Sequence, residues 1–505
     1  MTRLLLASAI FLTACIYKLN AAQTLRFANY YDNHMVLQMS PKQAQVWGYA
    51  STVGDTVFVT LNGANVANAT VKHGSGSMGV WSALLPPQNA GGHATLEIKS
   101  HDGHVKLTNV MFGDVWVCSG QSNMVFPMYH VLNQSYELEL SSHFHNIRFM
   151  AVKTSRSNST LAEPAISTRW QMPTVNDVGT QHFSAVCLLY AMNIAPHINR
   201  PIGLVQTAYG GTMIEAWSSP DAIATCGLHD RKGAVVGPLE LWNAMLFPLL
   251  KMTIYGVLWY QGESNSGYYQ DYMCQFPAMI DDWREKFHAA SHQQSSKTFP
   301  FGFVQLAAVK NQTIRVAMPD LRWAQTAGYG YVPNPVLQNV FMAVAMDLPD
   351  YASPYGSVHP RDKMDVAERL ALAGRAVAYG ESNIDFQGPI PSKFTLNSDH
   401  TLTIEFDHGN NPIEVRKNNG FEVCCSHLSN ETCKFWQYSY TNITHHDQTS
   451  VTIDTSVCHG YKSLVTSVKY AWEMSPCEFK MCAIYGRDND LPVSGFKASL
   501  PRHAV

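Results

Sequence analysis

The chain has 505 residues and a formal net charge of −3, and 46% of its residues are hydrophobic. This composition is typical of a globular protein with a large core, and the length corresponds to about three domains. The slightly acidic balance excludes a broad basic surface, so nucleic acid is not an expected partner.

The N-terminus has the pattern of a secretory signal peptide. A basic start at Arg3 precedes an apolar run over residues 4–17 and small residues up to Ala22, after which we expect cleavage. The run is too short to span a membrane. No other stretch is apolar enough to do so, so we expect a soluble mature protein without stable membrane insertion. It is predicted to enter the secretory pathway and to be secreted or lysosomal.

Residues 12–15 (Leu-Thr-Ala-Cys) also resemble a bacterial lipoprotein signal. Ten further cysteines argue against that interpretation, as do six Asn-x-Ser/Thr sequons. The predicted glycosylation sites are Asn68, Asn133, Asn158, Asn311, Asn430 and Asn442.

Residues 23–110 are predicted to form a small antiparallel β-sandwich. Val57, Val59 and Leu61 alternate with polar neighbours, and breaks rich in Gly, Asn and Asp separate this segment from similar ones.

Residues 111–388 alternate short apolar segments with longer helical ones, which indicates a parallel sheet. Strands are expected at residues 115–118, 202–206, 255–259, 301–306 and 340–346. Helices are expected at residues 183–196, 269–287 and 363–379. Pro277 predicts a kink or a later start in the second helix, and Gly380 ends the third. The polar residues 153–181 are expected to form a long surface connection.

Residues 389–505 return to a β pattern and contain a cluster of cysteines. In an exported chain such a cluster predicts disulfides within one small region, with the pairing left open. A zinc site is less favoured, because no paired Cys-x-x-Cys spacing is present. The cluster comprises Cys424, Cys425, Cys433, Cys458, Cys477 and Cys482.

Ser122 is a candidate nucleophile. Ser119 and Gly120 interrupt the apolar run before it, and a helix can begin at Ser122 or Asn123, both good N-cap residues. A serine on such a turn stands at the mouth of the sheet, beside free backbone N–H groups that can stabilise an oxyanion. The turn alone favours the simpler interpretation that Ser122 only caps a helix.

Two later loops follow expected strands at the same edge of the sheet. Gly210 and Gly211 let the backbone approach a ligand closely, although they suit a simple tight turn equally well. An amide at Gln261 or Asn265 can donate to an oxyanion, or it can satisfy its own loop.

A third loop places His359 just before the last helix of this region. From there the imidazole can reach the proton of Ser122. A single histidine among 21 is usually structural, so only its position relative to the other loops supports this role.

Together these segments resemble the sialate O-acetylesterase family, within the SGNH group of esterases. The resemblance covers most of the mature chain. Its motifs are Met-Val-Leu-Gln at 35–38, Val-Trp-Gly at 46–48, and the segments 116–124, 210–217, 259–265 and 359–363.

The resemblance implies a three-layer α/β fold, the SGNH-hydrolase (flavodoxin-like) parallel sheet, with flanking β-rich regions. It implies Ser122 as nucleophile and His359 as general base, with no metal and no organic cofactor. The implied oxyanion hole combines the Ser122 backbone N–H, Gly210 or Gly211, and the side chain of Gln261 or Asn265. The implied reaction removes O-acetyl groups, 9-O-acetyl above all, from sialic acids or sialoglycans through an acetyl-enzyme.

The sequence departs from the SGNH pattern at Gly356, where many members have an aspartate three residues before the histidine. Asp347, Asp350 or a main-chain carbonyl can orient His359 instead. We rank Asp347 above Asp350 and level with a carbonyl, because Asp347 closes the preceding strand.

Two alternative functions stay open. One is an acetylesterase for other acetylated glycans, and the other is a secreted carbohydrate-binding glycoprotein with a degenerate site. The sequence leaves the oligomeric state undetermined.

Overall fold

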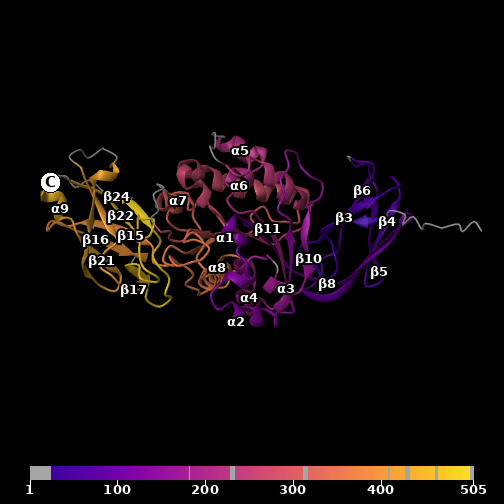
Figure 1. The fold of residues 1–505 in the computed structure, drawn as a ribbon, viewed down its shortest axis with the longest axis horizontal. Helices are drawn as coiled ribbons and strands as arrows, with labels where there is room; N and C mark the ends of the chain where they lie inside the picture. Colours follow the sequence, from indigo (N-terminus) through magenta and orange to yellow (C-terminus); the bar gives the residue numbers. More distant parts are fainter. Residues whose placement is uncertain are drawn as a thin grey trace, which may run out of the picture.

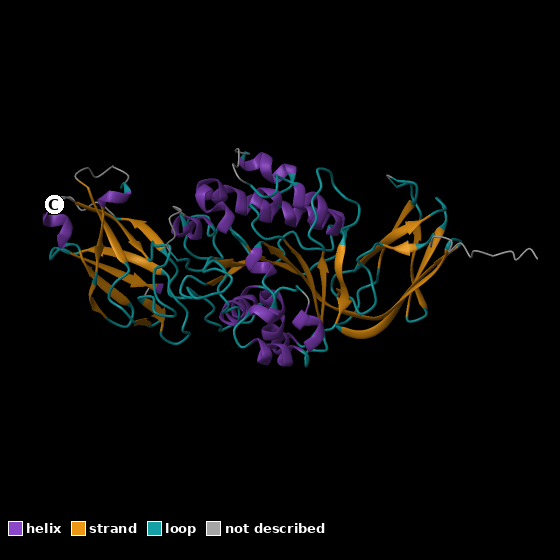
Figure 2. Cartoon of the chain, in the orientation of Figure 1, coloured by secondary structure: helices purple, strands orange, loops and turns teal. Residues whose placement is uncertain are grey.

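The computed structural model describes residues 24–74, 76–180, 182–227, 234–310, 317–407, 410–426, 433–460 and 464–500. A central α/β unit lies between two β-rich regions, the N-terminal region at one end and the C-terminal region at the other (Figures 1 and 2). The predicted signal peptide and the sequons at Asn311 and Asn430 lie outside the described residues.

The central sheet has the strand order β10-β9-β11-β8-β12-β13-β14. All neighbouring strands are parallel except β10 against β9. The strands β11, β8, β12, β13 and β14 follow the flavodoxin-like order 2-1-3-4-5, which confirms the predicted fold class. The bounds are β8 Gly103–Gly120, β9 Ile147–Val152, β10 Ile166–Gln171, β11 Ile202–Ala208, β12 Gly256–Tyr260, β13 Phe301–Gln305 and β14 Val340–Val344.

Helices cover both faces of this sheet. On one side lie α4 (Ala185–Ile198) and α8 (Met364–Val377), and on the other lie α5 (Pro220–Cys226) and α6 (Tyr269–Ala290) (Figure 1). Every residue of β11, β12, β13 and β14 is buried, as expected for parallel strands covered on both faces. The remaining α-helices are α1 Ser122–Val125, α2 Gln134–Ser141, α3 Val175–Thr180, α7 Met318–Ala324 and α9 Ser456–Gly460.

The three predicted helices correspond to α4, α6 and α8. Pro277 lies inside α6, which begins at Tyr269, so the alternative of a later start is wrong. The apolar spacing of this helix describes its buried face, which includes Tyr272, Phe276, Met279, Ile280, Trp283 and Phe287.

The segment predicted as a surface connection, residues 153–181, contains strand β10 and helix α3. This prediction is therefore wrong in part. Strand β10 lies at the edge of the sheet and buries only Trp170 fully, so its apolar pattern is weak. Strand β9 was also missed, because Arg148 interrupts its short apolar run. Arg148 is nevertheless buried and donates to the main-chain carbonyl of Ile147.

Strand β8 joins the N-terminal region to the central sheet. Its first half pairs with β7 and its second half with β11 and β12, within one 18-residue strand. The predicted boundary at residue 110 therefore falls inside this strand, so the two regions share a strand rather than a linker.

The N-terminal region contains two sheets, of which one is β1-β3-β6 and the other combines β2, β4, β5 and β7 with β8. Strand β2 runs parallel to β8, so the region is not purely antiparallel. The bounds are β1 Arg26–Phe27, β2 Val36–Gln38, β3 Gln45–Ala50, β4 Thr56–Leu61, β5 Ala64–Thr70, β6 Gly79–Leu84 and β7 Gly91–Ser100.

The described residues of the C-terminal region form three small antiparallel sheets, with orders β15-β16-β21-β20, β17-β23 and β19-β18-β22-β24. The bounds are β15 Pro391–Leu396, β16 Thr401–Phe406, β17 Ile413–Val415, β18 Phe421–Ser426, β19 Tyr438–Thr441, β20 Ile443–His446, β21 Ser450–Asp454, β22 Leu464–Tyr470, β23 Ile484–Gly486 and β24 Phe496–Ser499.

Disulfides confirm the prediction that the late cysteines pair with one another. The three bonds are Cys424–Cys433, Cys425–Cys458 and Cys477–Cys482. Two more lie in the central unit: Cys118–Cys187 joins β8 to α4, and Cys226–Cys274 joins α5 to α6.

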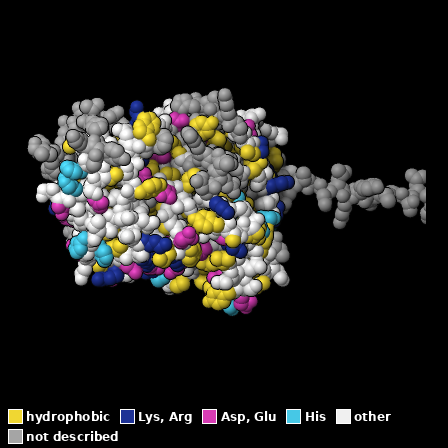
Figure 3. All heavy atoms as spheres, turned by 60° about the vertical axis from the view of Figure 1, so that its left-hand side comes forward, with side chains coloured by type: hydrophobic (Ala, Val, Ile, Leu, Met, Phe, Trp, Pro, Cys, Tyr) yellow, Lys and Arg dark blue, Asp and Glu magenta, His cyan; other side chains and the backbone are white. Residues whose placement is uncertain are grey.

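The described residues contain no helix that is both long and apolar enough to cross a membrane. On the face drawn in Figure 3, Lys and Arg side chains are scattered among acidic and uncharged ones.

Candidate active site

The turn from β8 into α1 places Ser122 at the carboxyl edge of the sheet. Gly120 has a φ of 138°, and a Cβ there would lie 2.2 Å from the Tyr260 carbonyl oxygen, so only glycine fits. Gln121 is the N-cap residue and Ser122 the first residue of α1. Neither Ser122 nor Asn123 is the helix cap, which removes the simpler interpretation of Ser122.

Ser122 and His359 are in direct contact. The Ser122 Oγ lies 2.7 Å from His359 Nε2, and His359 Nδ1 lies 2.7 Å from the Tyr355 carbonyl oxygen. Because a carbonyl only accepts, Nδ1 carries the proton and Nε2 is left to accept from the serine hydroxyl. The arrangement suits a serine nucleophile and its general base.

The environment of His359 keeps its imidazole neutral. Desolvation by burial lowers the pKa of His359, and the positive charge of Lys363 lowers it further, while the hydrogen bond to the Tyr355 carbonyl raises it. A neutral imidazole can accept a proton near neutral pH, as a general base must.

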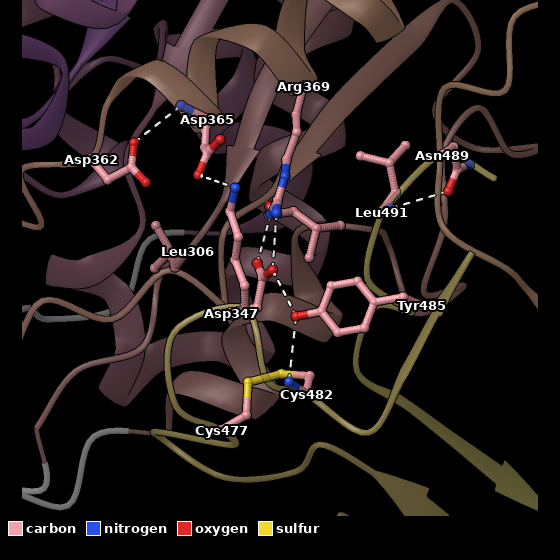
Figure 4. A network of polar contacts seen from close by, with 12 residues as sticks. Leu306, Asp347, Asp362, Asp365, Arg369, Cys477, Cys482, Tyr485, Asn489 and Leu491 are labelled. Atoms are coloured by element: carbon pink, nitrogen blue, oxygen red, sulfur yellow. Dashed lines mark hydrogen bonds and ion pairs between the residues drawn. A yellow bond between two sulfur atoms is a disulfide. The ribbon is translucent and has the colours of Figure 1, made fainter. Parts of the chain in front are cut away.

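Asp347 does not orient His359, which corrects the prediction. Its carboxylate is fully buried and binds Arg369 through two hydrogen bonds of 2.6 and 2.9 Å. The Tyr485 hydroxyl donates to it as well, at 3.0 Å (Figure 4). Asp350 instead forms an ion pair with Arg361 at 2.7 Å. The main-chain carbonyl of Tyr355 orients His359, which is the alternative that the sequence analysis ranked level with Asp347.

The loop after β11 brings Gly210 against the nucleophile. A Cβ on Gly210 would lie 3.4 Å from the Ser122 Cβ, an ordinary van der Waals distance, so the loop runs directly beside the nucleophile. Tyr209 N–H donates to the Gly120 carbonyl at 3.0 Å, which fixes this loop to the end of β8. Gly211 has a φ of 72°, a value that favours glycine.

The Gln261 amide is committed to other protein groups. Its Nε2 donates to the Thr212 carbonyl at 3.1 Å and to Asn265 Oδ1 at 2.7 Å. Both of its amide hydrogens are thereby used, so Gln261 is not placed to donate to an oxyanion.

Asn265 lies in the same loop as Gln261, but only one of its two amide hydrogens has a hydrogen-bond partner among the described residues. Its Nδ2 donates to Glu215 at 3.0 Å, and its Oδ1 accepts from the Ile214 N–H at 2.9 Å. The two amides of Gln261 and Asn265 hold the loop after β12 against residues 212–215.

Asn123, beside the nucleophile, is the centre of a buried polar network that sequence reasoning missed. Its Nδ2 donates to Glu263 at 2.6 Å and to the Val358 carbonyl at 2.8 Å, and its Oδ1 accepts from Lys363 Nζ at 2.7 Å. The network ties the residue after Ser122 to the residue before His359. These residues lie in the matching motifs, but only their burial together would have shown the connection.

Burial affects both charged members of this network. Desolvation lowers the pKa of Lys363 to about 7 and raises that of Glu263. The Lys363 ammonium also lies 4.9 Å from the centre of the Phe126 ring and 5.1 Å from that of Tyr260. These ring faces partly compensate for its lost hydration.

Aromatic rings border His359. Phe126 stacks near its imidazole with centroids 6.5 Å apart, and Tyr355 stacks on His130 with centroids 4.0 Å apart. An open groove of about 580 Å³ begins here. Its lining includes Tyr129, His130, Tyr136, Tyr355 and Arg361.

No cluster of three or more His, Cys, Asp or Glu side chains that could hold a metal ion is found in the described ranges.

Ser122 and Tyr355 lie within a segment that matches a known family model, and His359 lies just beyond its end. The model of a carbohydrate esterase, described as a sialic acid-specific acetylesterase, matches residues 112–355. A second model, of the sialate O-acetylesterase C-terminal domain, matches residues 392–500.

Named relatives and one solved structure are similar over nearly the whole chain. The human sialate O-acetylesterase is 40% identical over 491 residues, which cover 94% of this chain and 92% of the relative. The mouse sialate O-acetylesterase is 39% identical over 526 residues, 95% of each chain. The crystal structure of a carbohydrate acetylesterase from Xanthomonas citri has a TM-score of 0.77 at 27% identity, covering 94% of this chain and 99% of the other.

Proposed function

The chain belongs to the sialate O-acetylesterase family and is a sialic acid-specific acetylesterase, and we propose that Ser122 and His359 carry out its reaction as a dyad. The observation that carries this assignment is the 2.7 Å contact between Ser122 Oγ and His359 Nε2 at the carboxyl edge of the sheet. The same contact disfavours a degenerate site that only binds carbohydrate.

The reaction proceeds in two steps. His359 Nε2 takes the Ser122 proton as Oγ attacks the acetyl carbonyl, and the imidazolium then returns the proton to the departing sugar hydroxyl. Water next attacks the acetyl-serine as His359 takes its proton. The bond from the acetyl carbon to Oγ then breaks, the imidazolium returns that proton to Ser122 Oγ, and acetate leaves. The Tyr355 carbonyl holds the His359 tautomer throughout and stabilises the imidazolium.

Backbone N–H groups form the centre of the proposed oxyanion hole. Ser122 begins α1, where N–H groups have no partner within the helix, and Gly210 borders Ser122 directly. We assign the donors to Ser122, to Gly210 or Gly211, and to the second amide hydrogen of Asn265. The Gln261 amide holds this loop through its bonds to Thr212 and Asn265, and it does not donate to the oxyanion.

The favoured substrate position is the 9-O-acetyl ester. This ester stands at the end of the flexible side chain of sialic acid, where a half-buried serine can reach it. The groove beside Tyr355 is assigned to the glycan that carries the sialic acid, because its aromatic side chains have apolar faces and polar tips.

The five disulfides support an oxidising compartment, and we infer a secreted or lysosomal protein. The four sequon asparagines within the described residues are all exposed, which supports their glycosylation: Asn68, Asn133, Asn158 and Asn442.

Turnover of 9-O-acetylated sialic acid tests the dyad. Ser122→Ala and His359→Ala should each lower kcat by several powers of ten, on the order of 10⁴ or more, with unchanged melting curves. Ser119→Ala is a matched control, because its Oγ donates to the Thr207 carbonyl and not to His359. Retained activity in folded Ser122→Ala would refute the nucleophile. Faster cleavage of acetylated xylan than of acetylated sialic acid would refute the substrate.

A further inference from the structure

Arg156 lies beside the loop that borders the nucleophile. Its Nη2 donates to the Tyr209 hydroxyl at 2.7 Å, and its Cζ lies 5.3 Å from the centre of the Tyr209 ring. Tyr209 directly precedes Gly210, where a Cβ would lie 3.4 Å from the Ser122 Cβ. A guanidinium group is therefore connected to the nucleophile through two consecutive residues.

The backbone that carries Arg156 is fixed in place. Ser157 N–H donates to the Glu240 carbonyl at 3.2 Å, and Asn243 Nδ2 donates to the Ser157 carbonyl at 3.1 Å. Leu161 N–H binds the Asn243 carbonyl at 2.9 Å. These bonds hold the exposed segment after β9 against the chain near residue 240, so Arg156 is presented from a defined position.

The charge of Arg156 is available to a ligand. The hydrogen bond to Tyr209 raises the pKa of Arg156, which keeps it cationic, and the nearby charge of Glu240 acts in the same direction. No ion pair joins Arg156 to a carboxylate in the part of the chain that the structure describes. One of its five N–H donors binds Tyr209, which leaves a fork of donors for an anion.

Two other cations near Ser122 are less suitable. Lys363 is completely buried, and its ammonium donates to Asn123. Arg361 is held by Asp350 through hydrogen bonds of 2.7 and 3.0 Å, which neutralise its charge. Arg156 thus combines exposure with free donors, unlike Lys363 and Arg361.

We propose that Arg156 binds the carboxylate of the sialic acid substrate and so selects acidic sugars over neutral acetylated ones. The inference rests on the proposed function. Sialic acid carries its carboxylate on the ring, and the 9-O-acetyl ester at the end of the side chain. A substrate can therefore place the ester at Ser122 while its carboxylate binds the guanidinium of Arg156. The planar guanidinium fork matches a carboxylate with two parallel hydrogen bonds.

A comparison of charged and neutral substrates tests this assignment. The probes are 9-O-acetyl-N-acetylneuraminic acid, its carboxylate methyl ester, and 4-nitrophenyl acetate. Arg156→Gln should lower kcat/KM for the free acid about tenfold, mainly through KM, since one lost charge-assisted pair is worth on that order. The same variant should change kcat/KM for both uncharged probes by less than about twofold.

Arg169→Gln is the matched control. Arg169 is also exposed, on the edge strand β10, and forms an ion pair with Asp32. The kcat/KM for each of the three probes should be unaffected by this change. Equal losses on the free acid and its methyl ester, or no loss on either, would overturn the inference. If the wild-type protein hydrolyses 4-nitrophenyl acetate but not acetylated sialic acid, the proposed substrate fails rather than the role of Arg156.

Discussion

His359 is placed to accept the proton of Ser122, and a hydrogen bond to a main-chain carbonyl determines the tautomer of its imidazole. The Tyr355 carbonyl occupies His359 Nδ1, so Nε2 stays free to accept, and no carboxylate is needed to hold the ring. Two residues were predictable here, Ser122 and His359, because both follow strands at the same sheet edge. A main-chain carbonyl was among the expected partners of Nδ1, but Tyr355 could not be predicted as its source, because any residue type supplies a carbonyl.

Asp347 was ranked level with a main-chain carbonyl as the partner of His359, and its contacts show why it does not have that role. Its position at the end of β14 suited the role. However, its carboxylate is bound by Arg369, which projects from α8, and by Tyr485, which lies 138 residues later in the chain. Sequence proximity to the strand end revealed neither contact.

Asp347→Asn should therefore affect stability more than turnover. The change leaves the buried Arg369 without its counter-charge, so the free energy of unfolding should fall by about 3–5 kcal/mol. The kcat of the remaining folded protein should fall by at most about tenfold. Urea unfolding and turnover of purified protein measure the two effects. A loss of about 10⁴ in kcat at unchanged stability would restore a triad.

The pH profile should reflect a neutral base. Burial and the nearby Lys363 charge hold the pKa of His359 below its usual value of 6.5. His359 acts when unprotonated, so kcat/KM should rise with pH through a pKa below 6.5 and then level off. Lys363→Met should move this acid limb to higher pH, because it removes a positive charge. If kcat/KM of the wild-type enzyme instead rose through a pKa above 6.5, this account of His359 would be contradicted.

At the scale of elements, β8 determines the geometry of the site. The apolar run at 115–118 predicted the part of β8 near its C-terminal end. Its first half alternates as an antiparallel strand and was assigned to the N-terminal region, so one continuous strand was not predicted. Gly120 and the turn into α1 then place Ser122 where β11 and β12 end. Gly210 and Asn265 reach the site from loops after those two strands, as the motif order predicted.

The disulfide Cys118–Cys187 should stabilise this element strongly. It closes a loop with a sequence separation of 69, whereas Cys477–Cys482 spans 5. The loss of unfolded-state entropy predicts that replacing the first pair by alanine costs about 4 kcal/mol, and the second about 2 kcal/mol. Chemical denaturation of the two double variants measures the difference. A larger effect for the short loop would contradict this explanation.

At the scale of the whole molecule, the C-terminal region is bound to the catalytic unit through buried polar groups. Arg322 donates to the carbonyls of Glu473 and Met474 at 2.8 and 2.9 Å. Lys480 N–H donates to the Asp347 carbonyl at 2.8 Å. The Tyr485 hydroxyl donates to the carboxylate of the same residue (Figure 4). The sequence predicted a separate β region, but it did not predict this interface, which involves residues distant in the chain.

A chain that ends at Gly388 is therefore expected not to fold as a stable monomer. The truncation removes two of the four carbonyls that accept from the Arg322 guanidinium, and it removes the Tyr485 and Lys480 donors to Asp347. Lost partners of buried polar groups are costly. Size-exclusion chromatography and turnover of the truncated protein provide the measurement. A monomer with full-length activity would show that the catalytic unit is independent of the C-terminal region.

Covalent labelling tests the central claim most directly. The protein is incubated with a fluorophosphonate, digested, and mapped by peptide mass spectrometry. We expect a single adduct on Ser122, labelling slowed by at least about a hundredfold in His359→Ala, and no adduct in Ser122→Ala. An adduct on a different residue, or an unlabelled wild-type protein that still hydrolyses acetylated sialic acid, would contradict the Ser122–His359 dyad.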